Sequence, residues 1–394
     1  MNPLVSRLRF ASILLATLSL ASASSLVTPQ TIDDEIGIGY GLEIADINGD
    51  GKDDILLVDK DNVAWYENPT WEKHVISGPL TEKDHVSIAA RDTDGDGKAE
   101  IAVGAQWQPR DSENSGAVFL LKPGATSKGP WAPQQLHHEP TVHRMLWVKG
   151  PEQQFFLTVL PLHGRGNDAG TGAGVGLKFL GYNPPTEKRD TWDTFLINNQ
   201  FHKAHNYDIV SRGEHRSEEL LSASMEGVHL LNPQTTPWKS VQLSSEGAGE
   251  VRHGKLPNGK PFVATIEPIH GNEVVVNTYT SLNFKAKHLD RTVLADDYIQ
   301  GHALAAADFL GIGSDQIIAG RRGGRPDDAV GIQLFQPNAD GSEWTLVADI
   351  DSGNMACEDL KVGDLDGDGR PEIVACGRRT KNVVIYWNNT TNPN

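Results

Sequence analysis

Three acidic loops of one design are the residues best suited to chemistry in this chain. Their side-chain oxygens stand at places 1, 3, 5 and 9: Asp46, Asn48, Asp50 and Asp54 in the first loop; Asp92, Asp94, Asp96 and Glu100 in the second; and Asp364, Asp366, Asp368 and Glu372 in the third. A glycine after the fifth place lets the chain reverse. Proteins surround Ca²⁺ with several such oxygens at about 2.3–2.6 Å. The pattern therefore predicts three calcium sites with these residues as ligands.

Each loop is predicted to be the turn of a β-hairpin. An EF-hand is excluded, because its last acidic ligand lies at place 12 and helices flank it. Here a short apolar run such as residues 55–58 follows each loop, and no helical pattern surrounds it. A solvated Asp-Gly turn would explain one loop on its own, but three intact copies favour calcium.

The loops belong to a longer repeat. Seven units begin near Tyr40, His85, His143, His205, Glu250, His302 and Glu358. Most continue as short apolar strands separated by turns, without a convincing helix, which is typical of a four-stranded β-propeller blade. The last unit stops after its third strand at Trp387, while residues 26–32 offer an orphan strand that can complete it and leave no open edge. The sequence predicts an all-β protein, with one seven-bladed propeller over residues 24–394 whose last blade is closed by the N-terminal strand.

Composition and the first residues indicate the compartment. The formal net charge of -17, with no basic run, argues against nucleic acid and anionic membranes as partners. Residues 1–23 combine Arg7 and Arg9 with a short apolar stretch and small residues that a signal peptidase accepts. This stretch is too short to span a bilayer. We expect a signal peptide and a secreted or periplasmic protein without a membrane span, whose oligomeric state the sequence leaves open. Export permits a disulfide, and geometry decides whether Cys357 and Cys376 form one.

A second group of reactive side chains lies at the strand ends opposite the acidic loops. In a blade, the start of the innermost strand and the end of the second strand emerge on the same face. Innermost-strand starts carry His85, His143, His205, Arg252 or His253, His302, and Glu358; second-strand ends carry Trp107, His163, Arg165, Glu226, His270, Arg321, Arg322, Arg378 and Arg379. Charged groups around a shared axis need water or partners. We therefore expect a polar pocket at one mouth of the central channel.

This pocket has the residue types of a metal site and of a catalytic centre. Any single histidine is more simply a hydrogen-bonded strand residue, but histidines at comparable places in several blades favour a site. Imidazoles with a carboxylate suit Zn²⁺ or another transition ion. The predicted ligands are His143 and His205, followed by His85 and Glu226; the predicted catalytic residues are His302, His143, Arg321 and Glu358; and the predicted substrate contacts are His163, Arg165, Trp107 and Arg378. His302 is the candidate base, because we expect it to stand apart from the other histidines.

The motifs resemble known families at two levels. The acidic loops with the apolar runs after them resemble the calcium-binding repeats of the FG-GAP and VCBS class, which both adhesion proteins and enzymes use. Within that class, the segments around Asp84-His85, residues 136–143 and Ala204-His205 resemble the propeller domain of the fungal aldos-2-ulose dehydratase (1,5-anhydro-D-fructose dehydratase) family. That family carries cupin domains after its propeller, whereas this chain ends at Asn394, so isomerisation assigned to them is not expected here.

The resemblance implies a lyase acting on a keto sugar, a small molecule or an oligosaccharide. Elimination of water or an alcohol beta to a carbonyl needs a base for the alpha proton, a cation or donors for the developing negative charge, and an acid for the leaving oxygen. Two other functions stay open. A calcium-stabilised propeller that only binds carbohydrate or protein would tolerate loss of His143 or His205. A polysaccharide lyase would need a uronic acid, with its carboxylate, in place of a ketone.

Overall fold

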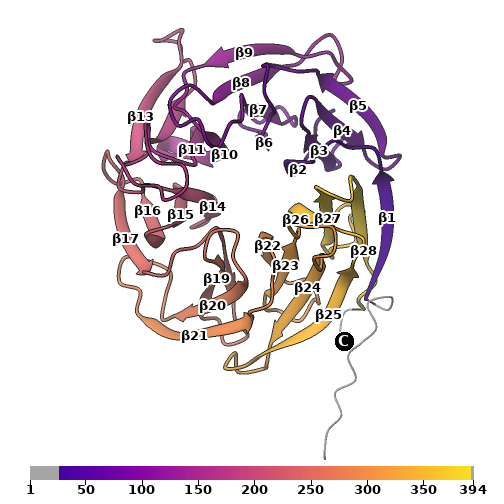
Figure 1. Ribbon diagram of the computed structural model, residues 1–394. Coiled ribbons are helices and arrows are strands. Elements are labelled where there is room, and N and C mark those ends of the chain that lie inside the picture. The colour runs from indigo at the N-terminus through magenta and orange to yellow at the C-terminus, as the bar shows by residue number, and fades with distance from the viewer. Residues whose placement is uncertain (1–25, 392–394) are drawn as a thin grey trace, which may run out of the picture.

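The computed structural model describes residues 26–391, which form short antiparallel strands joined by turns and loops. Seven four-stranded sheets follow one another around a ring, as Figure 1 shows along the ring axis. Helix is essentially absent from the described residues, where η1 (Pro151–Gln153) is a single 3-10 turn. The all-β propeller and its seven blades are therefore confirmed. The predicted signal peptide, residues 1–23, lies outside the described residues.

Six blades are each built from four consecutive strands. Blade 1 has β2 (Gly41–Ala45), β3 (Asp54–Val58), β4 (Val63–Glu67) and β5 (Glu72–Ser77). Blade 2 has β6 (Ser87–Arg91), β7 (Glu100–Ala105), β8 (Ala117–Lys122) and β9 (Ala132–Leu136). Blade 3 has β10 (Val142–Lys149), β11 (Phe155–Pro161), β12 (Phe179–Asn183) and β13 (Asp193–Asn198). Blade 4 has β14 (Ala204–Val210), β15 (Glu219–Ser224), β16 (Gly227–Asn232) and β17 (Lys239–Ser244). Blade 5 has β18 (Glu250–Lys255), β19 (Pro261–Glu267), β20 (Glu273–Tyr279) and β21 (His288–Ala295). Blade 6 has β22 (Gly301–Ala307), β23 (Gln316–Arg321), β24 (Gly331–Pro337) and β25 (Trp344–Ser352).

The seventh blade joins the two ends of the chain. It contains β26 (Cys357–Gly363), β27 (Glu372–Gly377) and β28 (Val383–Asn388), and its outermost strand is β1 (Val27–Asp33). Strand β1 pairs antiparallel with β28, from Val27 opposite Asn388 to Asp33 opposite Val383. Figure 1 shows the indigo first strand lying beside the yellow last one. The predicted closure of the ring by the N-terminal strand is confirmed, and β28 has no open edge.

The apolar cores lie between neighbouring blades. Strands in the middle of each sheet are buried on both faces, as in β3, where every residue is buried. Each junction between two blades has its own cluster of buried apolar side chains. Blades 1 and 2, for example, share Trp65, Ile88 and Trp131. Because such strands meet apolar neighbours on either side, they read as continuous apolar runs rather than alternating ones.

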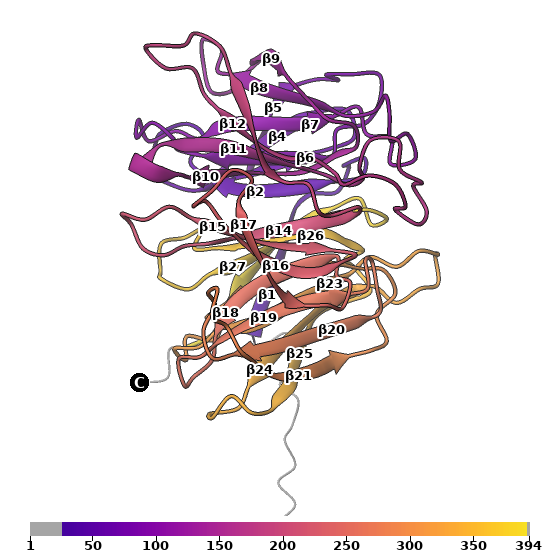
Figure 2. The same ribbon diagram turned by 90° about the vertical axis from the view of Figure 1, so that its left-hand side faces the viewer.

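The repeat places acidic loops and histidines on opposite faces. The acidic loops join β2 to β3, β6 to β7 and β26 to β27, at the ends of innermost strands, whereas His143, His205 and His302 lie at innermost-strand starts. The side view shows strands crossing the ring between two faces that carry the turns (Figure 2). In the first loop both Gly49 and Gly51 have φ of 81°, a left-handed conformation that favours glycine. Nowhere in residues 26–391 is there a helix long and apolar enough to cross a membrane.

Candidate functional site

Four innermost strands carry a β-bulge at the same place. The register shifts between Val142 and Arg144, between Ala204 and Asn206, between Gly301 and Ala303, and between Cys357 and Asp359. The residue skipped by the ladder is His143, His205, His302 or Glu358. The innermost strands of blades 1, 2 and 5 pair with their second strands without a shift. A bulge leaves one residue unpaired and redirects its side chain, so these four blades deliver equivalent side chains to one mouth of the channel.

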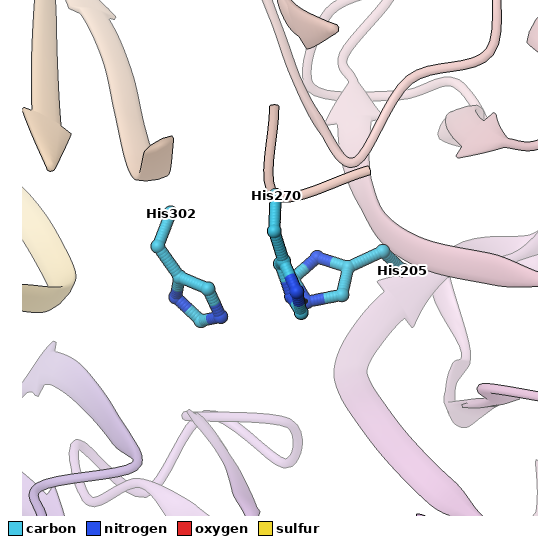
Figure 3. A group of neighbouring side chains, drawn as sticks. All are labelled: His205, His270 and His302. Carbon is cyan, nitrogen blue, oxygen red and sulfur yellow. Dashed lines mark hydrogen bonds between the residues drawn. The ribbon is translucent and has the colours of Figure 1, made fainter. Parts of the chain in front are cut away.

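Three histidines form the centre of this mouth. The ring centroids of His205 and His270 are 4.4 Å apart, those of His205 and His302 are 5.0 Å apart, and those of His270 and His302 are 4.8 Å apart. One ring nitrogen from each lies within 4.8 Å of the others. Figure 3 shows the three imidazoles turned towards one another. His270 comes from the turn between β19 and β20 and complements the two bulge residues.

A hydrogen bond orients the ring of His302, and a buried carboxylate lies close to the ring of His205. Nδ1 of His302 donates to the carbonyl oxygen of Glu358 at 2.6 Å. Nδ1 of His205 lies 2.9 Å from Oε1 of Glu250. A neutral imidazole carries one proton, so a proton on Nδ1 leaves Nε2 as an acceptor. Nε2 of His205 forms a hydrogen bond of 2.7 Å with Nε2 of His270, so one of these two nitrogens donates the proton and the other accepts it.

Burial keeps the imidazoles neutral. Desolvation lowers the pKa of His205 and His302 well below its ordinary value, and the positive charges of Arg144 and Arg322 lower it further. The pKa of His270 is lowered by burial first and then by His205 and the same arginines. At neutral pH these rings are therefore lone-pair donors, which is the state that metal coordination needs.

His143 lies beside the three-histidine cluster. Its ring centroid is 4.6 Å from that of His205, and its ring stacks on Trp107 at 4.8 Å with 12° between the planes. Neither ring nitrogen has a hydrogen-bond partner among the described residues. Burial lowers its pKa well below the ordinary value. The structure thus brings together the predicted site residues His143, His205, His302 and Trp107.

Glu358 gathers two arginines next to His302. It is 2% exposed, and it accepts hydrogen bonds from Nη1 of Arg322 at 2.8 and 2.9 Å and from Nη1 of Arg378 at 2.9 Å. The predicted Arg321 instead lies 3.6 Å from Asp297 and packs over the ring of Tyr298. Neighbouring residues of a strand point to opposite faces, so Arg322 rather than Arg321 reaches the mouth.

Three expectations about the histidine site need correction. His302 does not stand apart, because it lies within the cluster with His205 and His270. His85 is held by backbone groups, since its Nε2 accepts from the amide of Leu80 at 3.0 Å and its Nδ1 lies 3.4 Å from the carbonyl oxygen of Asn62. Both of its nitrogens are occupied, so no lone pair remains for a metal.

Glu226 also differs from the predicted ligand set. Its Oε1 accepts from Nδ1 of His202 at 2.8 Å and from the backbone amide of His202 at 3.1 Å. Glu226 therefore pairs with His202, which is not one of the three histidines of the cluster. The set that the structure brings together consists of His205, His270 and His302. Sequence reasoning placed His270 at the mouth but did not count it as a ligand.

The glycine-rich stretch forms an ordered loop beside the mouth. Asn167 is 4% exposed, and its side chain donates to the carbonyls of Gly172, Val175 and His202. Arg165 is anchored to Glu139 at 3.3 Å. His163 is buried, and desolvation lowers its pKa to about 4. These contacts fix the loop against blades 3 and 4.

A cavity of about 310 Å³ occupies the central channel. All seven innermost strands line it, and its charged side chains include Arg144, Asp208, Arg252 and Asp359. Arg144 follows His143 directly in sequence. The neutral histidines at the mouth therefore lie next to a polar, charged channel.

The acidic loops share one hydrogen-bond framework. In the first loop Asp46 accepts from the amides of Gly49 and Gly51, Asn48 accepts from the amide of Asp50, and Asp54 accepts from the amide of Ile47. Equivalent bonds recur in the loops of Asp92 and Asp364. The framework holds the side-chain oxygens of each loop around one point.

Among residues 26–391, the one ion pair to a carboxylate of the acidic loops joins Arg370 to Asp368. Burial first, and then neighbouring loop carboxylates, raise the pKa of Asp54 to about 7, and they raise that of Glu372 likewise to about 7. The pKa of Glu100 is raised for the same reasons. Side-chain oxygens of Asp364, Asp366 and Glu372 lie within 4.8 Å of one another, as do those of Asp92, Asp94 and Asp96. These donors fit a hard cation such as Ca²⁺.

Cys357 and Cys376 are separate buried thiols. The thiol of Cys376 donates to the carbonyl of Gly39 at 3.0 Å. In the ladder of β26 and β27, Cys357 lies opposite Gly377, and Cys376 lies opposite Asp359. The hairpin therefore places the two cysteines in neighbouring residue pairs, and no disulfide links them.

Comparison with known proteins supports the repeat and the fold. Residues 46–103 match the FG-GAP-like repeat family, and residues 86–121 match the FG-GAP repeat family. The chain therefore carries FG-GAP repeats. No curated protein matches the chain.

Solved structures share the propeller architecture at low identity. A chain of the mitotic checkpoint complex has a TM-score of 0.59 and 11% identity, covering 98% of this chain and 100% of that chain. BBS1N in complex with ARL6DN has a TM-score of 0.57 and 13% identity, covering 92% of this chain and 96% of that chain. The exotype rhamnogalacturonan lyase YesX has a TM-score of 0.51 and 13% identity, covering 93% of this chain and 76% of that chain. At these identities the likeness concerns the fold alone.

Proposed function

We propose that this FG-GAP repeat propeller is an exported, metal-dependent carbon-oxygen lyase that eliminates water or an alcohol beta to the carbonyl of a keto sugar. The observation that carries the proposal is the cluster of His205, His270 and His302 at the channel mouth, with His143 and Trp107 beside it. The resemblance to the aldos-2-ulose dehydratase family suggests the substrate class. A propeller of similar fold serves a lyase in YesX, so the scaffold is compatible with elimination chemistry.

The donor set of the cluster fits a transition ion such as Zn²⁺. Its three imidazoles are buried and neutral, and two of them have Nδ1 directed at an oxygen. Zn–N bonds are about 2.0–2.1 Å, so nitrogens on one ion lie within ~4.2 Å of each other. The 4.8 Å span of the cluster needs only a small side-chain adjustment. A bound ion would supply Lewis-acid polarisation of the substrate carbonyl.

The chain's own residues supply the other requirements of elimination. His143 is a neutral imidazole whose ring nitrogens have no partner, so it is our candidate to accept the alpha proton. The face of Trp107 that is not covered by His143 suits stacking against a sugar ring. Arg378 has a 41% exposed side chain and can donate to developing negative charge. The carbon-hydrogen and carbon-oxygen bonds break, a carbon-carbon double bond forms, and the proton that His143 has accepted is returned to the leaving oxygen.

Calcium is proposed as a structural ion of three loops, on the face opposite this site. The recurrent framework around Asp46, Asp92 and Asp364 supports it, together with the uncompensated carboxylates. Its role there is to fix hairpins and stabilise the folded state by binding it preferentially.

The decisive experiment combines metal analysis with an activity assay. Purified protein is incubated with keto sugars and, separately, with oligosaccharides of uronic acids, and the absorbance of the conjugated product is followed. We expect product from a keto sugar, and loss of product and of pocket metal in His205→Ala. His215→Ala, an exposed histidine, serves as the matched control. Product from uronic acids alone would reassign the substrate. No product from either class, with no pocket metal, would leave a calcium-stabilised binding propeller.

A further inference from the structure

Glu250 is a buried carboxylate that directly adjoins the histidine cluster. It is the first residue of β18 and is 2% exposed. Its Oε1 lies 2.9 Å from Nδ1 of His205. Its Oε2 accepts from Nδ2 of Asn206 at 2.6 Å and lies 4.0 Å from Nη2 of Arg252. The two carboxylate oxygens therefore face different partners.

We propose that Glu250 is a positioning residue that takes the Nδ1 proton of His205 in a hydrogen bond and so keeps the Nε2 lone pair of His205 directed at His270. This inference rests on the proposed function, in which His205 is a metal ligand. The inference adds Glu250 as the residue that determines which ring nitrogen of His205 carries the proton.

The contact geometry supports this role. Nδ1 of His205 and Oε1 of Glu250 face each other at 2.9 Å, and neither atom is taken by a hydrogen bond to any other group among the described residues. Histidines that bind metals commonly donate their other N–H to a carboxylate or a carbonyl, which fixes the tautomer and the ring orientation. Glu250 and the Glu358 carbonyl would serve His205 and His302 in this way.

Keeping a carboxylate here costs stability. Burial raises the pKa of Glu250, and Arg252, Arg144 and the bond from Asn206 offset this only in part. A purely apolar contact could pack β14 against β18 without that desolvation cost. A role in orienting His205 gives a reason for a carboxyl group at this place.

The substitution Glu250→Gln tests the role with almost unchanged shape. Asn206 cannot turn its amide freely, because its Oδ1 accepts from the amide of Tyr207 at 2.8 Å. The glutamine oxygen must therefore face the donors Asn206 and Arg252, which turns its NH₂ group towards Nδ1 of His205. An N–H donor at that position requires Nδ1 to be the acceptor. The proton of His205 then moves to Nε2, and the lone pair in the cluster is lost.

The experiment reads the tautomer of His205 in metal-free, full-length protein by NMR with ¹⁵N-labelled histidine. We expect Nδ1–H in the wild type, Nε2–H in Glu250→Gln, and a 10- to 100-fold weaker affinity for Zn²⁺ in that variant. Glu43→Gln is the matched control, because Glu43 lines the same channel but pairs with Lys361 at 3.2 Å. It should change neither the tautomer nor the affinity.

Two results would overturn the inference: Nε2–H in the wild type, or an unchanged tautomer in a folded Glu250→Gln protein. The first needs no variant, so it applies even if Glu250→Gln does not fold. Failure of the proposed function is distinguishable. A wild type that binds no Zn²⁺ but has Nδ1–H on His205 would reject the metal site and keep the role of Glu250.

Discussion

At the scale of single residues, the mouth of the channel depends on imidazoles kept neutral by burial. His143, His205 and His302 have pKa values lowered well below the ordinary value, chiefly by desolvation. Their lone pairs are therefore available at neutral pH without a preceding loss of a proton. Lone-pair donors that touch one another need a cation or shared protons to relieve the contact. This need distinguishes the cluster from isolated core histidines.

The first prediction separates ligands from structural histidines. His270→Ala and His302→Ala should each weaken binding of Zn²⁺ by more than the 10- to 100-fold typical of an outer contact, because each removes a ligand atom from the cluster. His85→Ala should keep the metal and lose thermal stability, because both of its nitrogens serve the backbone. Isothermal titration with Zn²⁺ and thermal melts measure the two effects. Equal loss of metal in all three variants would contradict the assignment.

The second prediction concerns acid sensitivity. The pKa of His163 is about 4 in the folded protein because of burial, against about 6.5 in an unfolded chain. Between these values the unfolded chain binds a proton that the folded protein does not bind, so the free energy of unfolding falls as the pH drops from 6.5 to 4. The loss is on the order of 3 kcal/mol when complete. Urea unfolding at pH 7 and pH 4.5 should show a smaller difference in His163→Asn than in the wild type.

The exposed His215 provides the control for this measurement. His215→Ala should keep the full difference between the two pH values. If His163→Asn also keeps it, the acid sensitivity arises from other groups, such as His85, whose pKa is likewise lowered by burial.

Residue positions were predictable from strand periodicity, but residue contacts were not. His143, His205 and His302 were found because each stands at an innermost-strand start. The β-bulges that turn them into the mouth are defined by the register with the second strand, which the sequence of one strand does not give. Arg321 and Arg322 show the same limit, because a one-residue uncertainty in a strand end exchanges the two faces.

At the scale of elements, the acidic hairpin is a framework that survives without its full ligand set. In blade 6 Asp308 accepts from the amides of Ile312 and Gly313, and Gln316 accepts from the amide of Leu310. The bond from Gly313 to Asp308 matches that from Gly51 to Asp46. The side chain at the ninth place accepts from a backbone amide near the start of the loop in both cases. The hairpin is therefore built by backbone hydrogen bonds to two side chains. A bound cation would explain why the three acidic loops carry additional carboxylates.

The third prediction tests this division. Replacing Asp94 and Asp96 together by asparagine should reduce the calcium stoichiometry from three to two, because the second loop then loses two charged ligands. At free calcium of ~100 times the Kd, each site contributes about 2.7 kcal/mol to the free energy of unfolding. Calorimetric titration of chelated protein gives the stoichiometry, and thermal melts with and without calcium give the stability. Asp308→Asn should leave the stoichiometry at three, and a change there would place an ion in blade 6.

The acidic hairpins could be predicted from the sequence, unlike the turns that follow the second strands. Side chains spaced within nine residues depend only on local geometry, so the loop from Asp46 to Asp54 could be recognised directly, while its binding of calcium stays a prediction. His270 depends on how blade 5 sits against blades 4 and 6, and Glu250 depends on contacts between β14 and β18. Tertiary contacts of this kind follow from the closed ring and not from any one element.

At the scale of the whole molecule, the ring is held by apolar junctions and one terminal pairing. Each blade packs against two neighbours. Removing one outer strand would therefore expose the edge of β28, whose residues are almost all buried. The number of blades could be predicted because seven similar units recur, and closure could be predicted because an unpaired strand stood at each end of the pattern.

The fourth prediction tests closure. Deleting residues 1–33 should lower the thermal midpoint strongly and promote association, because an unpaired β28 offers its backbone groups to other chains. Deleting residues 1–25 is the control and should leave the midpoint unchanged, since β1 begins at Val27. Thermal melts and size-exclusion chromatography measure both effects. Unchanged behaviour after the longer deletion would mean that the seventh blade does not need β1.

The pairing of Val27 with Asn388 also dictates the order in which the molecule can be completed. On a ribosome, β1 emerges first and waits for a partner that is synthesised last, while six blades can already assemble. Long-range pairing of this kind is slow, because loop-closure entropy must be overcome before the contact forms. Strand β1 therefore stays unpaired, and able to pair with a wrong strand, until β28 has been synthesised. Pairing of β1 with β28 is therefore the step that completes the ring, and it can occur only after the last strand has been made.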